Sequence, residues 1–474
     1  MPESFIDSMR LRCGSAAHHI LGVIAIAALA CKAMAAAQID QEQLLEMAID
    51  RVKTNTHALS RLTCEEHTSR WFYVGSSKGA NAQRQTASQK TTSDAFLPAL
   101  LTSIFQGRDL LWSDRLRVEL SLFDGKDMFS WPGGNTFDSD IDNLISNGAT
   151  LSGILGPFDV SVLLNDADPS SFRYQDTVTA FGKTLVRYAY KVPVQKSHLI
   201  ISDLAEKRVP VPYEGFFLVD ASTGDLRRLC VELNDFPQNT NLSLGAVATD
   251  YGAHTIGDTV AFVPVSSTMR LLFKQGALAV NAMQYVDCHQ FQAESTLHFN
   301  GVPEASGGTQ KSISERLPTI PKNRVVKLAL STAIDSHTAS TGDLVQAHVV
   351  KSLKGKDGEI LIPAGALVRG RILRLVQYAP PYNSVQLILK FDQIALNGSI
   401  AGVRLSPREA VPQDGAQNLY YTVNRVRRPV PISQGKTNAS NSQDDRKNGT
   451  GTFEFDNTDH LHLPVGYVTE WIVN

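Results

Sequence analysis

One run in the chain matches the nucleophile motif of serine hydrolases. Residues 75–79 read GSSKG, the G-x-S-x-G pattern in which a serine stands on the turn between a strand and a helix. A strand-like segment precedes the run, but polar residues follow where the motif requires an apolar helix, and no His-Gly-Gly oxyanion motif comes before it. The run therefore favours a surface loop over a catalytic serine.

A second pattern has the spacing of calcium ligands. Asp138, Asp140 and Asp142 imitate the start of an EF-hand loop, which also needs glycine at its sixth position and glutamate at its twelfth. Those positions hold Asn143 and Ala149. We therefore expect Asp138 or Asp140 to cap a short helix.

Two histidines could contribute to a metal site. His460 and His462 share one face of a predicted strand, with Asp456 and Asp459 close in the sequence. No further ligand stands at a recognisable spacing from them, and metal sites need three or four. We predict an exposed strand edge, with no metal and no cofactor.

The remaining chemistry-bearing residues form no recognisable catalytic set. Cys288-His289 is an isolated pair and favours a structural role. The sequence has no Walker loop, no G-x-G-x-x-G after a strand, no H-E-x-x-H and no C-x-x-C. Carboxylate pairs of glycosidase type can be distant in sequence, so a hydrolase with an unrecognised site stays an alternative. The absence of local motifs predicts a protein that is not an enzyme.

The N-terminus has the three-part plan of a secretory signal peptide. Arg10 and Arg12 precede an apolar run from Ile20 to Ala30, which is too short for a stable membrane anchor. Small residues then offer cleavage sites at 33–35 or 35–37. The alternative is a buried core helix. We predict a signal peptide over residues 1–37 and an exported protein of the periplasm or outer membrane.

The same segment contains a candidate lipidation site. Residues 28–31 read ALAC, which resembles the lipobox of bacterial lipoproteins, although Ala28 replaces the usual larger aliphatic residue. Acylation at Cys31 would be the only membrane attachment of the chain. Otherwise Cys31 leaves with the signal peptide.

Three of the five cysteines lie beyond this segment: Cys64, Cys230 and Cys288. An oxidising compartment permits one disulfide and one free thiol. Pairing Cys64 with Cys288 would join the two ends of the first predicted domain. Three free buried cysteines are the alternative.

Length and composition favour a folded protein of two or more domains. The chain has 474 residues, of which 43% are hydrophobic, and its formal net charge is −2. Such a balance gives no basic face for nucleic acid. The class of nucleic-acid-binding proteins is therefore not expected.

The first predicted domain, residues 38–300, combines one helix with an antiparallel sheet. Asp40 and Gln43 have capping-box spacing, and apolar residues recur at helical spacing through about Leu59. The pattern then changes to the two-residue period of strands, over 64–74, 116–122, 128–131, 186–192, 215–219, 226–233, 246–251, 259–273, 279–287 and 290–299. Apolar segments at 96–105 and 158–164 are predicted as helical inserts.

A second, all-β domain is predicted over 324–474. Residues 301–323 are rich in Gly, Pro and Ser and indicate a linker. Strands are expected over 325–330, 344–350, 367–376, 385–396, 453–455 and 467–472, with a disordered insert at about 433–451. The fold class is thus mainly β (α+β): a helix and a half-barrel sheet with helical inserts, followed by a small β-barrel.

The first domain resembles uncharacterised exported bacterial proteins whose sheet is similar to the lipoprotein-sorting (LolA/LolB-like) half-barrel. The resemblance covers about residues 40–300, and the runs LTCEE at 62–66, LRVE at 116–119, MFSWPG at 128–133 and FQAES at 291–295 carry it. The second domain is similar to the β-rich C-terminal module of TrbI-type conjugation proteins. The marks of that module are AIDS at 333–336, TGD at 341–343 and LIPAGA at 361–366, although this chain lacks the membrane anchor and stalk of that family.

The lipoprotein-sorting resemblance implies an apolar concavity that holds acyl chains under helical lids. The lid candidates here are Phe96, Leu97, Leu100, Leu101, Phe105, Phe158, Leu163 and Leu164. The alternative is that both inserts fill the core of the sheet. We therefore expect a non-enzymatic envelope protein that binds a lipid or other apolar ligand, with an envelope scaffold or protein-interaction module without an internal ligand as the alternative.

Overall fold

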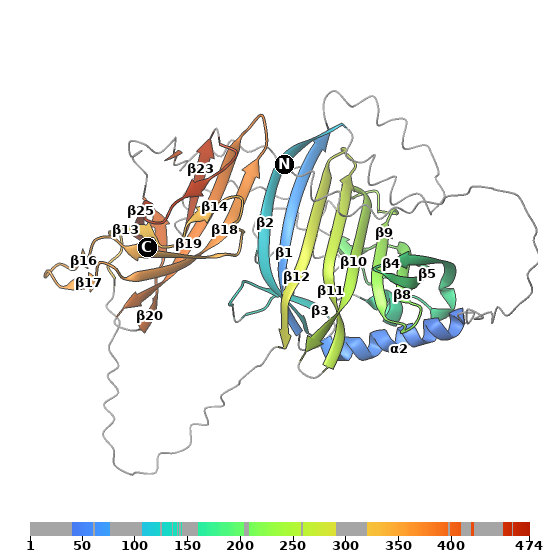
Figure 1. Ribbon diagram of the computed structural model, residues 1–474. Helices are drawn as coiled ribbons and strands as arrows, with labels where there is room; N and C mark the ends of the chain where they lie inside the picture. The colour runs from blue at the N-terminus through green and yellow to red at the C-terminus, as the bar shows by residue number, and fades with distance from the viewer. Residues whose placement is uncertain are drawn as a thin grey trace, which may run out of the picture. The chain divides into compact units, whose positions relative to one another are not determined.

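The computed structural model describes residues 40–59, 62–75, 107–123, 126–134, 136–139, 141, 144, 160–202, 208–256, 259–290, 320–396, 399–408, 419–420, 449–456 and 458–474. The structure is mainly antiparallel β, which confirms the predicted fold class (Figure 1). The signal segment, the first helical insert and most of the linker lie outside the described residues. The division into two domains stays a prediction.

The predicted helix is confirmed as α2 (Gln41–Leu59). Leu44, Ala48 and Val52 recur every four residues and are buried, so one stripe of the helix faces the core. Two contacts fix the helix to the sheet: the Tyr188 hydroxyl donates to the Gln41 carbonyl at 2.6 Å, and the Asn55 side chain bonds both backbone groups of Phe262. The helix therefore belongs to the core of the N-terminal strands.

Ten N-terminal strands pair in one antiparallel series, in the spatial order β3-β2-β1-β12-β11-β10-β9-β8-β5-β4 (Figure 1). Their bounds are β1 (Leu62–Gly75), β2 (Arg108–Phe123), β3 (Lys126–Ser130), β4 (Arg173–Ala180), β5 (Lys183–Val192), β8 (Tyr213–Asp220), β9 (Leu226–Leu233), β10 (Leu242–Ile256), β11 (Thr259–Phe273) and β12 (Leu278–Gln290). A small hairpin of β6 (Ile200–Ser202) and β7 (Arg208–Pro210) stands apart. The first and last long strands, β1 and β12, are neighbours.

The C-terminal strands share a second core. They are β13 (Val325–Leu330), β14 (Ile334–Asp335), β15 (Leu344–Val349), β16 (Leu353–Lys354), β17 (Ile360–Ile362), β18 (Leu367–Tyr378), β19 (Ser384–Leu396), β20 (Ser399–Gly402), β21 (Leu405–Pro407), β22 (Leu419–Tyr420), β23 (Thr450–Asp456), β24 (His462–Leu463) and β25 (Val468–Val473). Trp471 lies at the centre of this core and meets the ring of Phe391 edge-on, with centroids 5.1 Å apart. Buried and more exposed residues alternate in β19 and β25, which is why the two-residue hydrophobic period in the sequence predicted these strands.

Three sequence expectations fall mostly outside the described residues. Asp138 forms an isolated antiparallel bridge with Phe129 through two backbone hydrogen bonds of 2.7 and 2.8 Å, while Asp140 is not described, so the expected helix cap stays a prediction. Strand β23 begins at Thr450, and most of the insert expected at about 433–451 is not described. Strand β12 ends at Gln290, and residues 291–299 of the next expected strand are not described.

A disulfide joins Cys64 in β1 to Cys288 in β12, the two cysteines that the sequence analysis considered for pairing. The register of these strands shifts between Thr63 and Glu65, so one additional residue of β12 is accommodated opposite β1. Asp287, beside the disulfide, is the extra residue at this bulge and has a positive φ of 48°. The third cysteine of the described residues, Cys230, is buried and free.

The β2 strand also bonds to the C-terminal strands. Its residues 112–114 pair with residues 376–378 of β18, and Arg117 N donates to the Thr341 carbonyl at 2.8 Å. Gly342 follows with φ +103°, and a β-carbon there would lie 2.1 Å from the Arg117 carbonyl oxygen. Only glycine fits this close approach.

Reduction of the Cys64–Cys288 disulfide should destabilise the protein. The bond closes a segment with a sequence separation of 224, so we expect a loss of about 2–5 kcal/mol of unfolding free energy. Urea denaturation with and without dithiothreitol measures the loss. The double variant Cys64→Ser/Cys288→Ser is the control, and a reductant effect that persists in it would contradict the assignment.

Replacement of Gly342 by alanine should also destabilise the protein, by at least about 1–3 kcal/mol from backbone strain. The matched control is Gly402→Ala in β20, where a β-carbon meets nothing within 4 Å. Thermal unfolding of both variants tests the expectation. Equal melting temperatures would show that the contact of residue 342 with β2 does not support the fold.

Candidate ligand-binding site

Alternate side chains of β1 form one buried face of the N-terminal sheet. Cys64, Glu66, Thr68, Arg70 and Phe72 are all buried, whereas the residues between them from position 65 onward are more exposed. Successive residues of a strand point to opposite faces, so these five side chains lie on the same side. We call this side the inner face.

Strand register extends the inner face over β2, β12, β11 and β10. Residues directly opposite one another in a sheet share a face. Three rows can be followed across the register: Asp114–Arg70–Asn281–Met269–Val247, Leu116–Thr68–Met283–Ser267–Thr249 and Trp112–Phe72–Ala279–Leu271–Gly245. The inner face is therefore built by strands more than 200 residues apart in sequence.

The inner face has an apolar part at each end of β1. At one end Phe72 and Trp112 stack with centroids 5.6 Å apart and planes 4° apart, and Phe273 meets Phe72 at 5.9 Å. At the other end Leu120 and Val118 are fully buried beside the disulfide. Polar residues cross the sheet between these two ends, where the Thr249 and Ser267 hydroxyls lie 3.0 Å apart.

The strongest polar contact of the inner face is the pair formed by Arg70 and Asp114. Arg70 Nε donates to Asp114 Oδ1 at 2.6 Å and Nη2 to Oδ2, and the two side chains are 4% and 2% exposed. The guanidinium also lies over the Trp112 ring, 5.8 Å from its centroid. A buried pair loses its hydration, so each atom needs a partner. Arg70 Nη1 has none among the described residues.

Glu66 and Tyr285 face each other on neighbouring strands of the inner face. Burial raises the pKa of the Glu66 carboxyl to about 7, although the Thr68 hydroxyl donates to it at 2.6 Å and opposes the shift. Burial likewise raises the pKa of Tyr285 well above its usual value. The Ser267 side chain opposes this shift, but within the described part of the chain its contact with the Tyr285 hydroxyl does not reach the geometry of an ordinary hydrogen bond. At neutral pH the inner face thus holds an acid near its titration point and two incompletely bonded donors.

The described structure does not bring the predicted lid residues to this face. Phe96, Leu97, Leu100, Leu101, Phe105 and Phe158 lie outside the described residues. Leu163 and Leu164 belong to a short π-helix, η4 (Val162–Asp166), which packs against α2. Leu163 is 2% exposed. The lid role and the core-filling alternative both stay predictions.

Sequence reasoning missed four titratable residues of the inner face: Glu66, Arg70, Asp114 and Tyr285. In the first half of β1, polar residues stand on both faces of the strand. The sequence therefore does not show which of these side chains are buried. The signal lies in β2, where apolar residues at 116, 118, 120 and 122 mark the buried phase. Asp114 stands two residues before Leu116, so it lies on the same buried face of β2.

The other sequence motifs do not form a catalytic site in the described structure. Cys288 is bonded to Cys64, and His289 is exposed, with Nδ1 2.8 Å from the Asp287 carbonyl oxygen. Gly75 ends β1, and the serines that follow it lie outside the described residues. His460 and His462 both contact the carboxylate of Asp335, which lies 125 or more positions earlier in the chain, and not that of their sequence neighbours Asp456 and Asp459.

Comparisons with known proteins give distant structural matches only. No protein-family model matches the sequence, and no curated protein matches it significantly. A putative outer membrane lipoprotein-sorting protein domain from Vibrio parahaemolyticus is 10% identical with a TM-score of 0.24, over 55% of this chain and 97% of that one. A LolA superfamily protein from Nitrosomonas europaea is 9% identical with a TM-score of 0.20, over 53% and 94%. Scores this low carry no argument about function.

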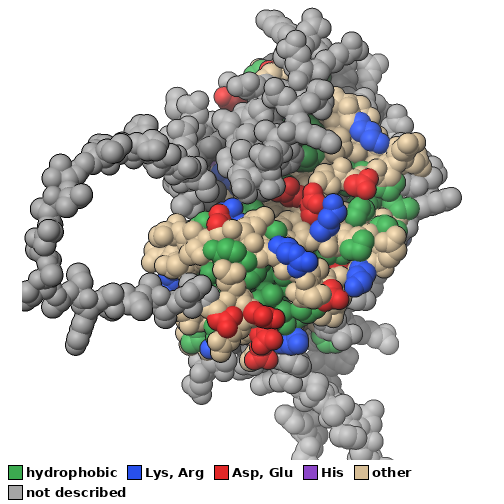
Figure 2. Space-filling model, turned by 90° about the vertical axis from the view of Figure 1, so that its right-hand side faces the viewer, with side chains coloured by type: hydrophobic (Ala, Val, Ile, Leu, Met, Phe, Trp, Pro, Cys, Tyr) green, Lys and Arg blue, Asp and Glu red, His purple; other side chains and the backbone are tan. Residues whose placement is uncertain are grey.

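Among the described helices, none has the length and apolar character that a membrane crossing needs. Figure 2 shows one face of the molecule on which hydrophobic, acidic and basic side chains are interspersed. That face has no large area of a single charge, which fits the nearly balanced composition.

Replacement of Glu66 by glutamine should remove a pH dependence of stability. The folded-state pKa of about 7 lies above the usual value of 4.5, so the unfolded chain releases its proton first and stability falls as pH rises between these values. Urea denaturation at pH 5 and pH 8 should show this fall in the wild type and a smaller one in Glu66→Gln. Glu46→Gln, in an exposed position of α2, is the control and should behave as the wild type.

Proposed function

We propose that this protein is a non-enzymatic carrier or receptor that binds an acyl lipid against the inner face of its N-terminal sheet. The observation that carries the proposal is the buried band of incompletely bonded polar groups between two apolar areas. Most buried polar atoms of folded proteins are hydrogen-bonded, so unpaired ones call for a ligand or water. A ligand with both apolar and polar parts fits this arrangement.

The two apolar areas would hold the hydrocarbon part of the ligand. Phe72, Trp112 and Leu271 at one end, and Val118 and Leu120 at the other, are aromatic and aliphatic side chains of one core cluster, which the ligand would contact from within. Each Å² of acyl surface that leaves water contributes about 25 cal/mol. An acyl chain lying along β1 could contact both areas.

The polar band would bind the linkage between acyl chain and headgroup. Arg70 Nη1 and the Tyr285 hydroxyl are donors, so they select an acceptor. The charge of Arg70 is already balanced by Asp114, and burial favours the neutral form of Glu66 up to about pH 7. An additional buried anion would lack a counter-charge, so a neutral ester or amide carbonyl is the preferred acceptor.

Export is part of the proposal. The N-terminal charge and hydropathy pattern supports a signal peptide, and a disulfide between β1 and β12 fits an oxidising compartment such as the periplasm. Acylation of Cys31, an envelope protein partner and a TrbI-like role of the C-terminal strands remain predictions.

Native mass spectrometry of the chain, isolated from membrane-containing extracts, tests lipid binding. We expect adducts with the masses of acyl lipids. Tyr285→Phe, which removes only the phenolic hydroxyl, should weaken their retention by roughly tenfold at most, the value of one buried hydrogen bond. Tyr174→Phe, at an exposed position of β4, is the matched control. A clean apo mass in every preparation would contradict lipid binding, and equal retention in both variants would contradict the role of the polar band.

A further inference from the structure

The small two-stranded sheet of β14 and β24 places four potential metal-ligating side chains on one surface. Asp335 and His337 alternate with the buried residues Ile334 and Ser336. On the partner segment, His460 and His462 alternate in the same way with Leu461 and Leu463, which are also buried. Asp335 and His462 belong to the strands, whereas His337 lies in the turn after β14 and His460 comes just before β24. The three histidines are exposed, and Asp335 is half-buried.

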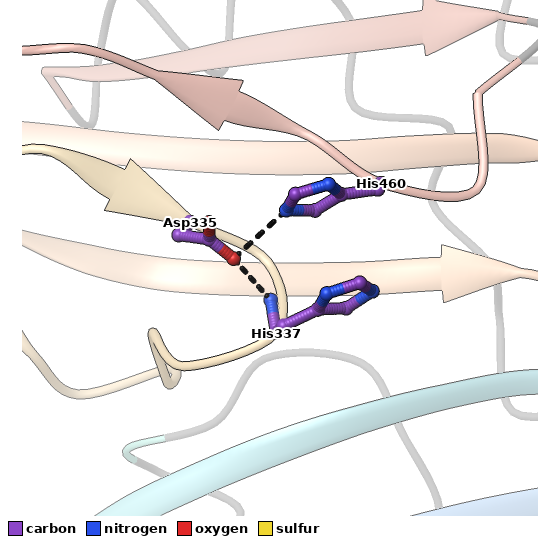
Figure 3. Close-up of side chains that lie close together, drawn as sticks. All are labelled: Asp335, His337 and His460. Carbon is purple, nitrogen blue, oxygen red and sulfur yellow. Dashed lines mark hydrogen bonds and ion pairs between the residues drawn. The ribbon is translucent and has the colours of Figure 1, made fainter. Parts of the chain in front are cut away.

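Asp335, His337 and His460 converge (Figure 3). Each of these three residues offers one atom that could bind a metal, and these three atoms lie within 4.8 Å of one another. His460 Nε2 is 3.0 Å from Asp335 Oδ1, and the rings of His337 and His460 stack with centroids 4.0 Å apart and planes 2° apart. Two ligands of a tetrahedral Zn²⁺ with bonds of about 2.0–2.1 Å are about 3.3 Å apart, close to the nitrogen–oxygen distance seen here.

His462 supports the same carboxylate from its other side. Its Nδ1 lies 3.2 Å from Asp335 Oδ2, while the His337 backbone N–H donates to Asp335 Oδ1 at 2.8 Å. These contacts fix the orientation of the Asp335 carboxylate, as the hydrogen-bonding partners of a metal ligand do.

Buried hydrogen bonds fix the backbone beneath the cluster. Ser336 N donates to the Leu461 carbonyl at 2.9 Å, and Leu461 N donates back to Ser336 Oγ at 3.0 Å. Gln377 of β18 donates to Ser336 Oγ at 3.1 Å and to the Asp459 carbonyl at 2.6 Å. The two ligand-bearing segments, 125 positions apart in sequence, are thereby locked together before any ion binds.

We propose that Asp335, His337 and His460 bind a divalent first-row transition metal, with Zn²⁺ the best match, and that His462 orients the carboxylate. Imidazole and carboxylate ligands suit Zn²⁺, whereas Ca²⁺ and Mg²⁺ require oxygen ligands. Three protein ligands leave a coordination position for water or another donor. This site lies on the C-terminal strands and is independent of the proposed lipid site.

Calorimetric titration of Zn²⁺ into the full chain, purified without a histidine tag, tests the site. We expect one Zn²⁺ per chain, bound at least about tenfold more weakly by His337→Ala and by His460→Ala. His462→Ala should give a smaller loss, because it removes an orienting partner. His348→Ala, on β15 of the same group of strands and outside the cluster, is the control and should bind as the wild type.

A thermal shift gives a second reading that does not depend on titration heats. Zn²⁺ should raise the melting temperature of the wild type and of His348→Ala but not of His460→Ala. Equal Zn²⁺ affinity in the cluster variants and the control, or no binding by the wild type, would overturn the proposal. Circular dichroism verifies that each variant is folded.

Discussion

The burial of the Arg70–Asp114 ion pair on the inner face constrains the N-terminal sheet. Two charges removed from water are tolerated only if they meet each other with good geometry. This requirement sets the register between β1 and β2, since Arg70 must stand opposite Asp114. A slip of one residue would turn Glu66 and Arg70 to the other side together with every apolar neighbour.

The same strand, β2, connects the inner face to the C-terminal strands. Asp114 stands opposite Arg70 on one side and opposite Val376 of β18 on the other. Arg371 extends this connection by donating to the Pro132 carbonyl at 2.9 Å and lying 5.6 Å from the centre of the Trp131 ring. The register of β2 is therefore fixed on both of its edges. A structural change in the C-terminal strands can be transmitted to the inner face through β2.

Much of the fold follows from local patterns. The stripe of Leu44, Ala48 and Val52 predicts α2, and the alternation of Leu116, Val118 and Leu120 predicts β2, because both periods are visible within about ten residues. The cysteine count limits the disulfide to a few pairs, among them Cys64–Cys288. The backbone bridge of Asp138 with Phe129 could not be predicted, because it depends on a partner strand that is set by tertiary structure.

The sites themselves depend on contacts that no local pattern contains. Arg70 and Asp114 are 44 positions apart, and Glu66 meets Tyr285 only because β1 pairs with β12. The sequence analysis considered His460 and His462 but found no third ligand, since Asp335 lies 125 positions away and reaches them through the pairing of β14 with β24. Such residues become visible only when the register of distant strands is known.

Quenching of tryptophan fluorescence by a lipid with brominated acyl chains tests most directly whether the inner face binds lipid. Trp112 lies on the inner face, stacked on Phe72, whereas Trp71 is on the opposite face of the same sheet. The account predicts quenching in the wild type and in Trp71→Phe, and its loss in Trp112→Phe. Quenching that disappears with Trp71 and persists without Trp112, or no quenching in the wild type, would contradict a lipid site on the inner face.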